Sequence, residues 1–290
     1  MSPPVAIVTG GSSGIGLAVT EHLINAGYHT AIFDVDEKRG KAEAQQLDAG
    51  LGRCVFHRVD VTNYDQQAKA FKDTFEWGGN RLDVFFANAG IADTDSIYRE
   101  LAPLDEGTGL PQPLNLQVFD IDVNAVIQGI HLARHFFARN STPGGKIVIT
   151  SSCLGVYSNH SVPLYSTAKH ALIGLIRSSA PVYAGMGITI NGLLPVLVDT
   201  NIWPEHAQHM VDPARLTPKT TVCKAFAMFL ANDTMTGQTV ELALDQLIFR
   251  KQEAYSNENA QWMCDSHELF ETAVGPLLPN PVGQNYVKLE

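Results

Sequence analysis

Short, almost continuously apolar runs alternate with amphipathic segments along this chain, and this alternation constrains the fold more than any other feature. Runs without a polar face are typical of parallel strands buried on both sides of a sheet. They predict strands at Val5–Thr9, Thr30–Phe33, Cys54–Val59, Val84–Ala87, Lys146–Thr150, Ile188–Leu194 and Thr239–Leu244. The segments between them predict helices at Ile15–Ala26, Glu37–Leu47, Asp65–Trp77, Leu116–Arg139 and Tyr165–Ala184. Right-handed crossovers then give an α/β fold, with a doubly wound, mostly parallel seven-stranded sheet and helices on both faces.

The charge balance narrows the classes of partner. The 290 residues include 20 Lys and Arg against 30 Asp and Glu, a formal net charge of −10. Such a chain lacks the basic surface needed to bind nucleic acid or anionic lipid. No apolar run approaches the ~20 residues that span a bilayer, and the N-terminus lacks a signal-peptide pattern. We therefore expect a cytoplasmic protein without nucleic-acid or membrane partners.

The cysteines are few and scattered. Cys54, Cys153, Cys223 and Cys264 form no CxxC pair, and no His stands at the spacing of a zinc ligand. This pattern predicts neither a disulfide framework nor a structural metal.

A glycine-rich turn with the spacing G-x3-G-x-G follows the first predicted strand. Glycine lets a pyrophosphate approach the backbone closely, and the next helix offers N–H groups and a positive dipole end. The turn lacks the Lys-Ser/Thr pair of a triphosphate-binding loop, so it favours a dinucleotide, although a plain strand–helix turn stays an alternative. The residues expected at the cofactor are Gly10, Ser12, Ser13, Ile15 and Gly16.

Asp34 ends the second predicted strand. A carboxylate there accepts hydrogen bonds from ribose hydroxyls and repels a 2′-phosphate, while Lys38 and Arg39 come a few residues late. The pattern favours NAD over NADP, although Asp34 could serve only to start the next helix. The ends of the third and fourth strands should reach the same sheet edge and contribute Asp60, Val61, Asn88, Ala89 and Gly90.

Tyr165 and Lys169 are spaced i, i+4 on a predicted helix, so their side chains lie on one face. An ammonium favours the phenolate and lowers the pKa of a tyrosine, which makes such a pair a plausible acid and base. The strand before it delivers Ser152, whose hydroxyl can bind a substrate oxygen or merely cap a turn. Asn124 lies within a long predicted helix and could hold a water linking Lys169 to solvent, or be an exposed polar residue.

These residues together resemble the short-chain dehydrogenase/reductases, over roughly residues 4 to 245. The resemblance is carried by TGGSSGIG at 9–16, Asp34, Asp60-Val61, NAG at 88–90, Asn124, Ser152 and YSTAK at 165–169. It implies a single-domain Rossmann fold in which Tyr165 exchanges a proton, Lys169 binds the nicotinamide ribose, Ser152 orients the substrate oxygen and Asn124 holds the relay water. It also implies that Pro195, Val198 and Thr200 border the nicotinamide.

The resemblance has limits that bear on the substrate. The segment from Tyr165 and the acidic Asp34 look most like the NAD-dependent 15-hydroxyprostaglandin dehydrogenase-like branch, which implies a large apolar alcohol as substrate. The family usually has Pro-Gly where this chain has Pro195-Val196, so an isopropyl group is expected at the cleft.

Residues 1–250 are expected to form the dinucleotide-binding catalytic domain, including the substrate loops. Residues 251–290 are expected to form a C-terminal extension packed on that domain or on a partner subunit. The Pro- and Gly-rich stretch Glu100–Asn115 predicts a surface insertion, an active-site flap or an oligomer contact.

The sequence thus predicts an NAD(H)-dependent oxidoreductase that interconverts a secondary alcohol and a ketone on an apolar small molecule. Two alternatives stay open: a non-redox isomerase, cyclase or dehydratase on the same fold, and a catalytically silent NAD-binding protein. Apolar residues beyond a single stripe on the helices from Leu116 and Tyr165, together with the resemblance, predict a homodimer or homotetramer.

Overall fold

The computed structural model describes residues 2–98, 104–202, 210–266 and 272–273, which fold around an eight-stranded sheet. The strand order is β3-β2-β1-β4-β5-β6-β7-β8, parallel except that β8 is antiparallel to β7. The strands are β1 (Val5–Thr9), β2 (His29–Asp34), β3 (Cys54–Arg58), β4 (Val84–Ala87), β5 (Gly145–Thr150), β6 (Ile188–Pro195), β7 (Thr239–Ala243) and β8 (Gln246–Phe249). The order reverses between β1 and β4, which creates a crevice at the carboxyl ends of these strands.

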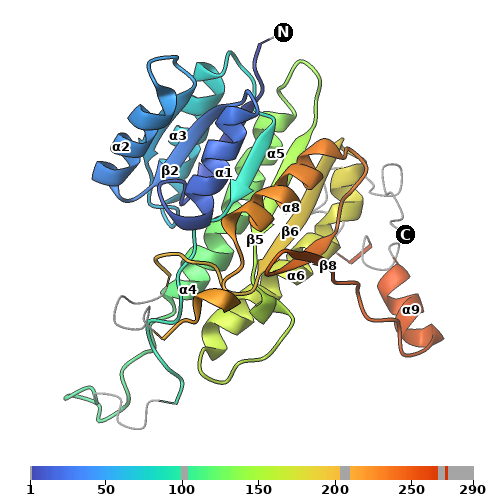
Figure 1. Ribbon diagram of the computed structural model, residues 1–290. Helices are drawn as coiled ribbons and strands as arrows, with labels where there is room; N and C mark the ends of the chain where they lie inside the picture. Colours follow the sequence, from blue (N-terminus) through green and yellow to red (C-terminus); the bar gives the residue numbers. More distant parts are fainter. Residues whose placement is uncertain (1, 99–103, 203–209, 267–271, 274–290) are drawn as a thin grey trace.

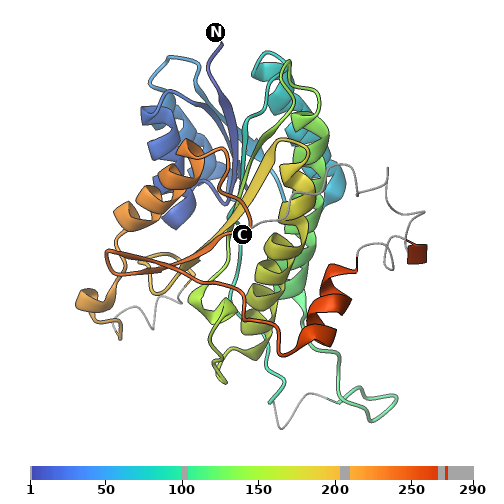
Figure 2. The same cartoon turned by 90° about the vertical axis from the view of Figure 1, so that its right-hand side faces the viewer.

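Two layers of helices cover the sheet (Figures 1 and 2). One face carries α1 (Gly14–Asn25), α2 (Glu37–Asp48) and α8 (Lys219–Ala231); the other carries α3 (Tyr64–Trp77), α5 (Ala125–Phe137) and α6 (Pro163–Ala184). The remaining short elements are α4 (Gln117–Phe119), η1 (Asp120–Asn124), η2 (Cys153–Gly155), η3 (Pro213–Arg215) and α9 (Glu258–Asp265).

Aromatic side chains fill the space between the sheet and both layers. Phe71 of α3 packs against Phe85 of β4, with ring centroids 5.2 Å apart, and Phe86 of the same strand packs 5.0 Å from Phe226 of α8. Neighbouring residues of β4 therefore anchor opposite layers, as alternation along a strand requires. Each buried ring contributes about 1.5–3 kcal/mol.

All seven predicted strands are confirmed, with ends shifted by one residue at most. Strand β8 was not predicted, because it is short and half exposed and its apolar run is only the three residues Leu247–Phe249. Helix α8 was not predicted either, although Val222, Ala225, Phe226 and Phe229 follow the i, i+3, i+4, i+7 spacing of a buried helix face.

The long helix expected at Leu116–Arg139 is interrupted. The single turn α4 leads into η1, a π-helical turn, before α5 continues the α-helix. A π turn inserts a residue and changes which side chains face the core; such turns are frequent at functional sites. Here Asp122 is fully buried and Asn124 is exposed.

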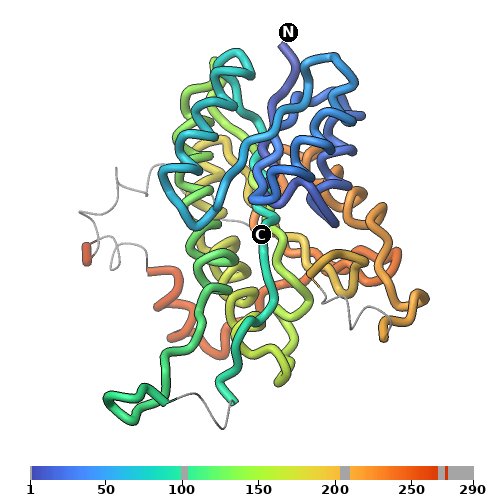
Figure 3. The backbone as a smooth tube through the Cα atoms, turned by 90° about the vertical axis from the view of Figure 1, so that its left-hand side faces the viewer, coloured from blue at the N-terminus to red at the C-terminus, as the bar shows by residue number. Residues whose placement is uncertain are grey.

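Two segments lie outside the packed layers. Residues 104–115 are exposed throughout and form a small hairpin closed by the bridge between Leu104 and Pro111 (Figure 3), which confirms the expected surface insertion in its described part. Residues 100–103 lie outside the described residues. Of the C-terminal extension, α9 buries no residue, so its packing on the domain or a partner stays a prediction. Among the described residues, no helix is long and apolar enough to cross a bilayer.

Candidate functional site

The glycine-rich turn brings the end of β1 against the start of α1. Gly10 adopts φ = 63°, in the left-handed region that favours glycine. A Cβ on Gly16 would lie 2.1 Å from the carbonyl oxygen of Gly10, so only a glycine fits there. The turn therefore keeps its backbone uncovered beside a helix N-terminus, the arrangement that binds a pyrophosphate.

Asp34 holds this turn against the end of β2. Its Oδ2 accepts hydrogen bonds from the hydroxyl of Ser12 (2.5 Å) and from the Ser12 backbone N–H (3.2 Å). Ser12 is buried, so its hydroxyl is directed at Asp34 rather than at the expected phosphate. The nearby guanidinium of Arg39 lies 3.2 Å from the carboxylate of Asp36 and is already paired.

Asn88 connects three strands at the same edge. Its amide donates to the carbonyl oxygen of Thr9 (3.2 Å), and its oxygen accepts from the hydroxyl of Thr150 (3.0 Å). The Thr9 hydroxyl in turn accepts from the backbone N–H groups of Asn88 and Ala89. The Asn88 side chain therefore links the ends of the three strands and holds the adjacent residues Ala89 and Gly90 in place.

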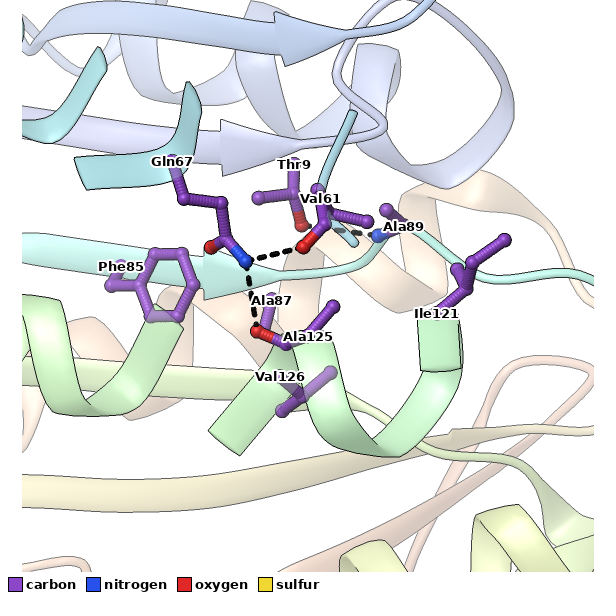
Figure 4. Close-up of a pocket in the computed structure, with 9 residues that line it drawn as sticks. All are labelled: Thr9, Val61, Gln67, Phe85, Ala87, Ala89, Ile121, Ala125 and Val126. Carbon is purple, nitrogen blue, oxygen red and sulfur yellow. Dashed lines mark hydrogen bonds between the residues drawn. The ribbon is translucent and has the colours of Figure 1, made fainter. Parts of the chain in front are cut away.

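A pocket opens where β1 and β4 meet α5 (Figure 4). It brings together Val61 and Ala89, two residues expected at the cofactor, with Thr9 and Ile121. Gln67 supports the pocket, because its amide donates to the carbonyl oxygens of Val61 (2.5 Å) and Ala125 (3.3 Å). Asp60, by contrast, is exposed and binds the hydroxyl of Thr62.

The segment after β6 reaches back to the glycine turn. A Cβ on Gly14 would lie 3.0 Å from Cγ2 of Thr200, so Thr200 packs directly on this turn. Val198 is buried, whereas the Val196 side chain is 41% exposed and open to a ligand. Pro195, the last residue of β6, is buried and pairs in register with Leu242.

Tyr165 and Lys169 project from the first turns of α6. Lys169 Nζ lies 5.2 Å from the centre of the Tyr165 ring and 3.2 Å from the carbonyl oxygen of Thr150, which it donates to. Asp93 fixes the helix start by accepting the backbone N–H groups of Leu164 (3.1 Å) and Tyr165 (2.5 Å). The ammonium therefore lies at the end of β5 and faces the ring of Tyr165.

Ser152 lies two residues after the end of β5 and is buried. Its hydroxyl oxygen accepts the backbone N–H of Leu154 at 3.1 Å, so it caps the η2 turn. The structure shows the turn-capping reading of this serine, with the O–H directed at the Cys153 Sγ 4.0 Å away. The substrate-binding reading stays a prediction, because the weak contact with sulfur leaves the O–H able to turn to a substrate oxygen.

Lys169 forms a buried ion pair that the sequence analysis did not foresee. Its Nζ lies 2.9 Å from Oδ2 of Asp122, with both side chains almost completely buried. Burial by itself lowers the pKa of the ammonium, but the charges of Asp122 and Tyr165 outweigh it and raise the pKa above its ordinary value. The other Asp122 oxygen accepts the backbone N–H of Ile91 at 2.9 Å.

Asn124 is exposed, and its amide donates to the exposed carboxylate of Asp120 at 3.0 Å. Its expected role in holding a water near Lys169 stays a prediction. The π turn is the physical reason for the exposure, because it turns Asp122 inward and Asn124 outward. The alternative reading of Asn124, an exposed polar residue, agrees with the structure. Asp120 and Asp122 are visible in the sequence two residues apart, but nothing in the sequence indicated that one of them would pair with Lys169.

Comparison with known proteins places these features in a family. A model described as short chain dehydrogenase matches residues 4–210. Short-chain dehydrogenase/reductase prx6 of Penicillium rubens is 35% identical over 258 residues, 85% of this chain and 85% of that protein. Cis-4-hydroxycyclohexanecarboxylate dehydrogenase of Sinomonas cyclohexanicum is 38% identical over 197 residues, 68% of this chain and 74% of that protein.

Solved structures share the fold. The 3-ketoacyl-(acyl-carrier-protein) reductase from Brucella melitensis, complexed with NADH, has a TM-score of 0.70 at 19% identity, covering 83% of this chain and 96% of that one. An actinorhodin polyketide ketoreductase with NADPH is equally similar, at 20% identity and the same coverage. At these identities the likeness shows the fold alone, and it confirms the expected single-domain Rossmann-like architecture.

Proposed function

Because the chain belongs to the short-chain dehydrogenase/reductase family, we propose that it interconverts a secondary alcohol and a ketone with NAD(H) as coenzyme. The observation that carries this proposal is the contact of the Lys169 ammonium with the Tyr165 ring and with the carbonyl oxygen of Thr150, two residues before Ser152. A name among the relatives supports the substrate chemistry, since one is a dehydrogenase of cis-4-hydroxycyclohexanecarboxylate, a secondary alcohol.

The glycine-rich turn fits a dinucleotide. A Cβ at Gly16 would collide with the Gly10 carbonyl, so the turn is a cradle that any side chain would fill. Gly10, Ser13, Ile15 and Gly16 would hold the pyrophosphate through backbone and hydroxyl groups, Asp34 the adenosine ribose, and Val61 with Ala89 the adenine side. Lys169, Val198 and Thr200 would border the nicotinamide end. The bound coenzyme supplies a carbon that accepts or donates hydride.

The chain's own groups move the proton. Ser152 orients the substrate hydroxyl by donating its O–H, and Tyr165 takes the hydroxyl proton as the substrate carbon is oxidised. Lys169 favours the phenolate form of Tyr165 from within the same helix face. In the reverse direction Tyr165 returns the proton to the carbonyl oxygen.

Replacement of the phenol tests this role most directly. We expect Tyr165→Phe to lower kcat by more than about a hundredfold, because general acid–base catalysis contributes about 10²–10⁴-fold, while NAD(H) binding survives. NADH formation from a panel of secondary alcohols measures it. Tyr64→Phe, which removes an exposed hydroxyl at the start of α3, is the matched control. Unchanged turnover in Tyr165→Phe would refute the assigned role.

The preference for NAD over NADP rests on charge. A 2′-phosphate would meet the carboxylate of Asp34, and the guanidinium of Arg39 is occupied by Asp36. We expect NADH to bind more tightly than NADPH. The variant Asp34→Asn keeps an acceptor for Ser12 and should reduce the ratio of the two dissociation constants about tenfold. Fluorescence titration with both coenzymes measures this. A native preference for NADPH contradicts the proposal.

The substrate is proposed to be apolar. The segments after Ser152 and after β6 expose the apolar side chains of Val156, Val196 and Ile202, which supports an apolar wall. The narrower likeness to the 15-hydroxyprostaglandin dehydrogenase-like branch belongs to this proposal. Part of the expected wall, residues 203–209, lies outside the described residues. Transfer of deuteride from labelled NADH into the product separates this function from an isomerase, cyclase or dehydratase and from a silent NAD-binding protein.

A homodimer or homotetramer and a cytoplasmic location complete the proposal. Ile127 on the outer face of α5 is 44% exposed, which supports a helix-mediated contact between subunits. Light scattering and cell fractionation measure these two properties, and a monomeric mass contradicts the first.

A further inference from the structure

A buried carboxylate lies next to the lysine of the proposed site. Asp122 is completely buried on η1, and its Oδ2 is 2.9 Å from Lys169 Nζ. A buried charge needs a partner, and here the partner is the same ammonium that faces the Tyr165 ring. The three ionisable groups therefore form one electrostatically coupled set rather than a pair.

Among the described residues, the charges that act on the Lys169 ammonium are those of Asp122 and Tyr165. Around Lys169, β5 contributes the Thr150 carbonyl oxygen, which carries no net charge. The Cys153 thiol of η2 lies beside the Ser152 hydroxyl, and burial raises its pKa. The helix turn α4 has no ionisable side chain. Asp93 is a further described carboxylate at this end of α6, and it binds the backbone N–H groups of Leu164 and Tyr165. Among these described groups, Asp122 is the one whose carboxylate touches the ammonium.

We infer that Asp122 is a positioning residue: its carboxylate fixes Lys169 and offsets part of the ammonium charge, and it thereby sets the pH at which Tyr165 loses its proton. An ammonium without a counter-charge favours a nearby phenolate strongly, whereas a paired one favours it less. The carboxylate therefore shifts the working range of the site to higher pH. The functional consequence rests on the proposed role of Tyr165, but the electrostatic coupling does not.

Asp122→Asn tests the coupling with little change of shape, because the amide keeps an oxygen for the Ile91 N–H. An opposite charge at about 4–6 Å shifts an ionisation by about 1–3 pH units, and Asp122 acts from behind Lys169, so we expect a shift of about one unit. The midpoint of Tyr165 ionisation should fall by that amount. NMR of protein labelled with ¹³C at tyrosine Cζ measures it without any turnover, and the signal missing in Tyr165→Phe identifies the residue.

Asp120→Asn is the matched control, because it removes the same charge from the same turn but from an exposed side chain that contacts Asn124. We expect no shift of the Tyr165 midpoint in this variant. If Asp122→Asn fails to fold, Gly90→Ala replaces it, since the new methyl would lie 3.0 Å from Asp122 Oδ2 and displace the carboxylate. That variant should move the midpoint in the same direction.

The acid limb of the kcat/KM profile for alcohol oxidation should move to lower pH together with the midpoint. A shifted midpoint in a protein that forms no NADH supports the coupling and refutes the proposed function. NADH formation with a midpoint that is unchanged, raised, or shifted equally by Asp120→Asn refutes the coupling and leaves the proposed function standing.

Discussion

The glycine-rich turn at β1 and the start of α6 lie at the same edge of the sheet, but different interactions hold them. The turn is fixed by close backbone packing, as between Gly10 and Gly16, and by hydrogen bonds such as that from Ser12 to Asp34. The start of α6 is fixed by the buried ion pair of Lys169 with Asp122 and by the Asp93 carboxylate. Steric fit therefore holds the glycine-rich turn in place, and charge holds the start of α6.

The two ends of the site should therefore tolerate different substitutions. Added volume should damage the turn at any pH, because a clash with backbone does not titrate. Removal of one charge should damage the start of α6, because the remaining charge is buried without a partner. Removal of both charges should destabilise the protein less than removal of one.

The largest effect is expected for Lys169→Met. This change leaves the Asp122 carboxylate buried without its cation, which costs about 3–5 kcal/mol of unfolding free energy. Urea denaturation at pH 7 measures it. The double variant Asp122→Asn/Lys169→Met removes both charges and should recover much of the loss. Equal stabilities of the single and the double variant would show that the charge of the pair is not what holds this end together.

A smaller effect is expected for Gly16→Ala at the other end. Its methyl would lie 2.1 Å from the Gly10 carbonyl oxygen, and such overpacking costs about 1–3 kcal/mol and closes the backbone to a pyrophosphate. Thermal unfolding and NADH titration measure both losses. Gly174→Ala on α6 is the matched control, because no atom lies within 4 Å of its Cβ and alanine gains about 0.5–1 kcal/mol in a helix. A loss in both variants would contradict the steric explanation.

The smallest effect is expected for Asn124→Ala. Its amide contacts only the exposed Asp120 among the hydrogen bonds of the described residues, so stability and turnover should change by less than about 0.5 kcal/mol and twofold. Denaturation and steady-state rates measure these quantities. A large loss of turnover would support the catalytic role that the sequence predicted for Asn124. It would contradict the expectation that Asp122, rather than Asn124, acts on Lys169.

The parallel strands and the glycine turn could be predicted because they depend on local patterns. A run of apolar residues indicates a strand that is buried on both faces. Where two backbone segments touch, only glycine leaves enough room, so the glycines mark the turn. The relative position of Tyr165 and Lys169 was predictable for the same reason, since two side chains four residues apart on a helix lie on the same face. Such features belong to the sequence alone.

The partner of Lys169 was decided by tertiary structure. One π-helical turn in η1 determines whether Asp122 or Asn124 faces the core, and no periodicity in the sequence announces that turn. The same holds for Ser12, whose hydroxyl is directed by a carboxylate 22 residues away on another strand. Charges and hydrogen bonds between distant segments depend on where the packed layers place them, so the residue types could be read from the sequence and their pairing could not.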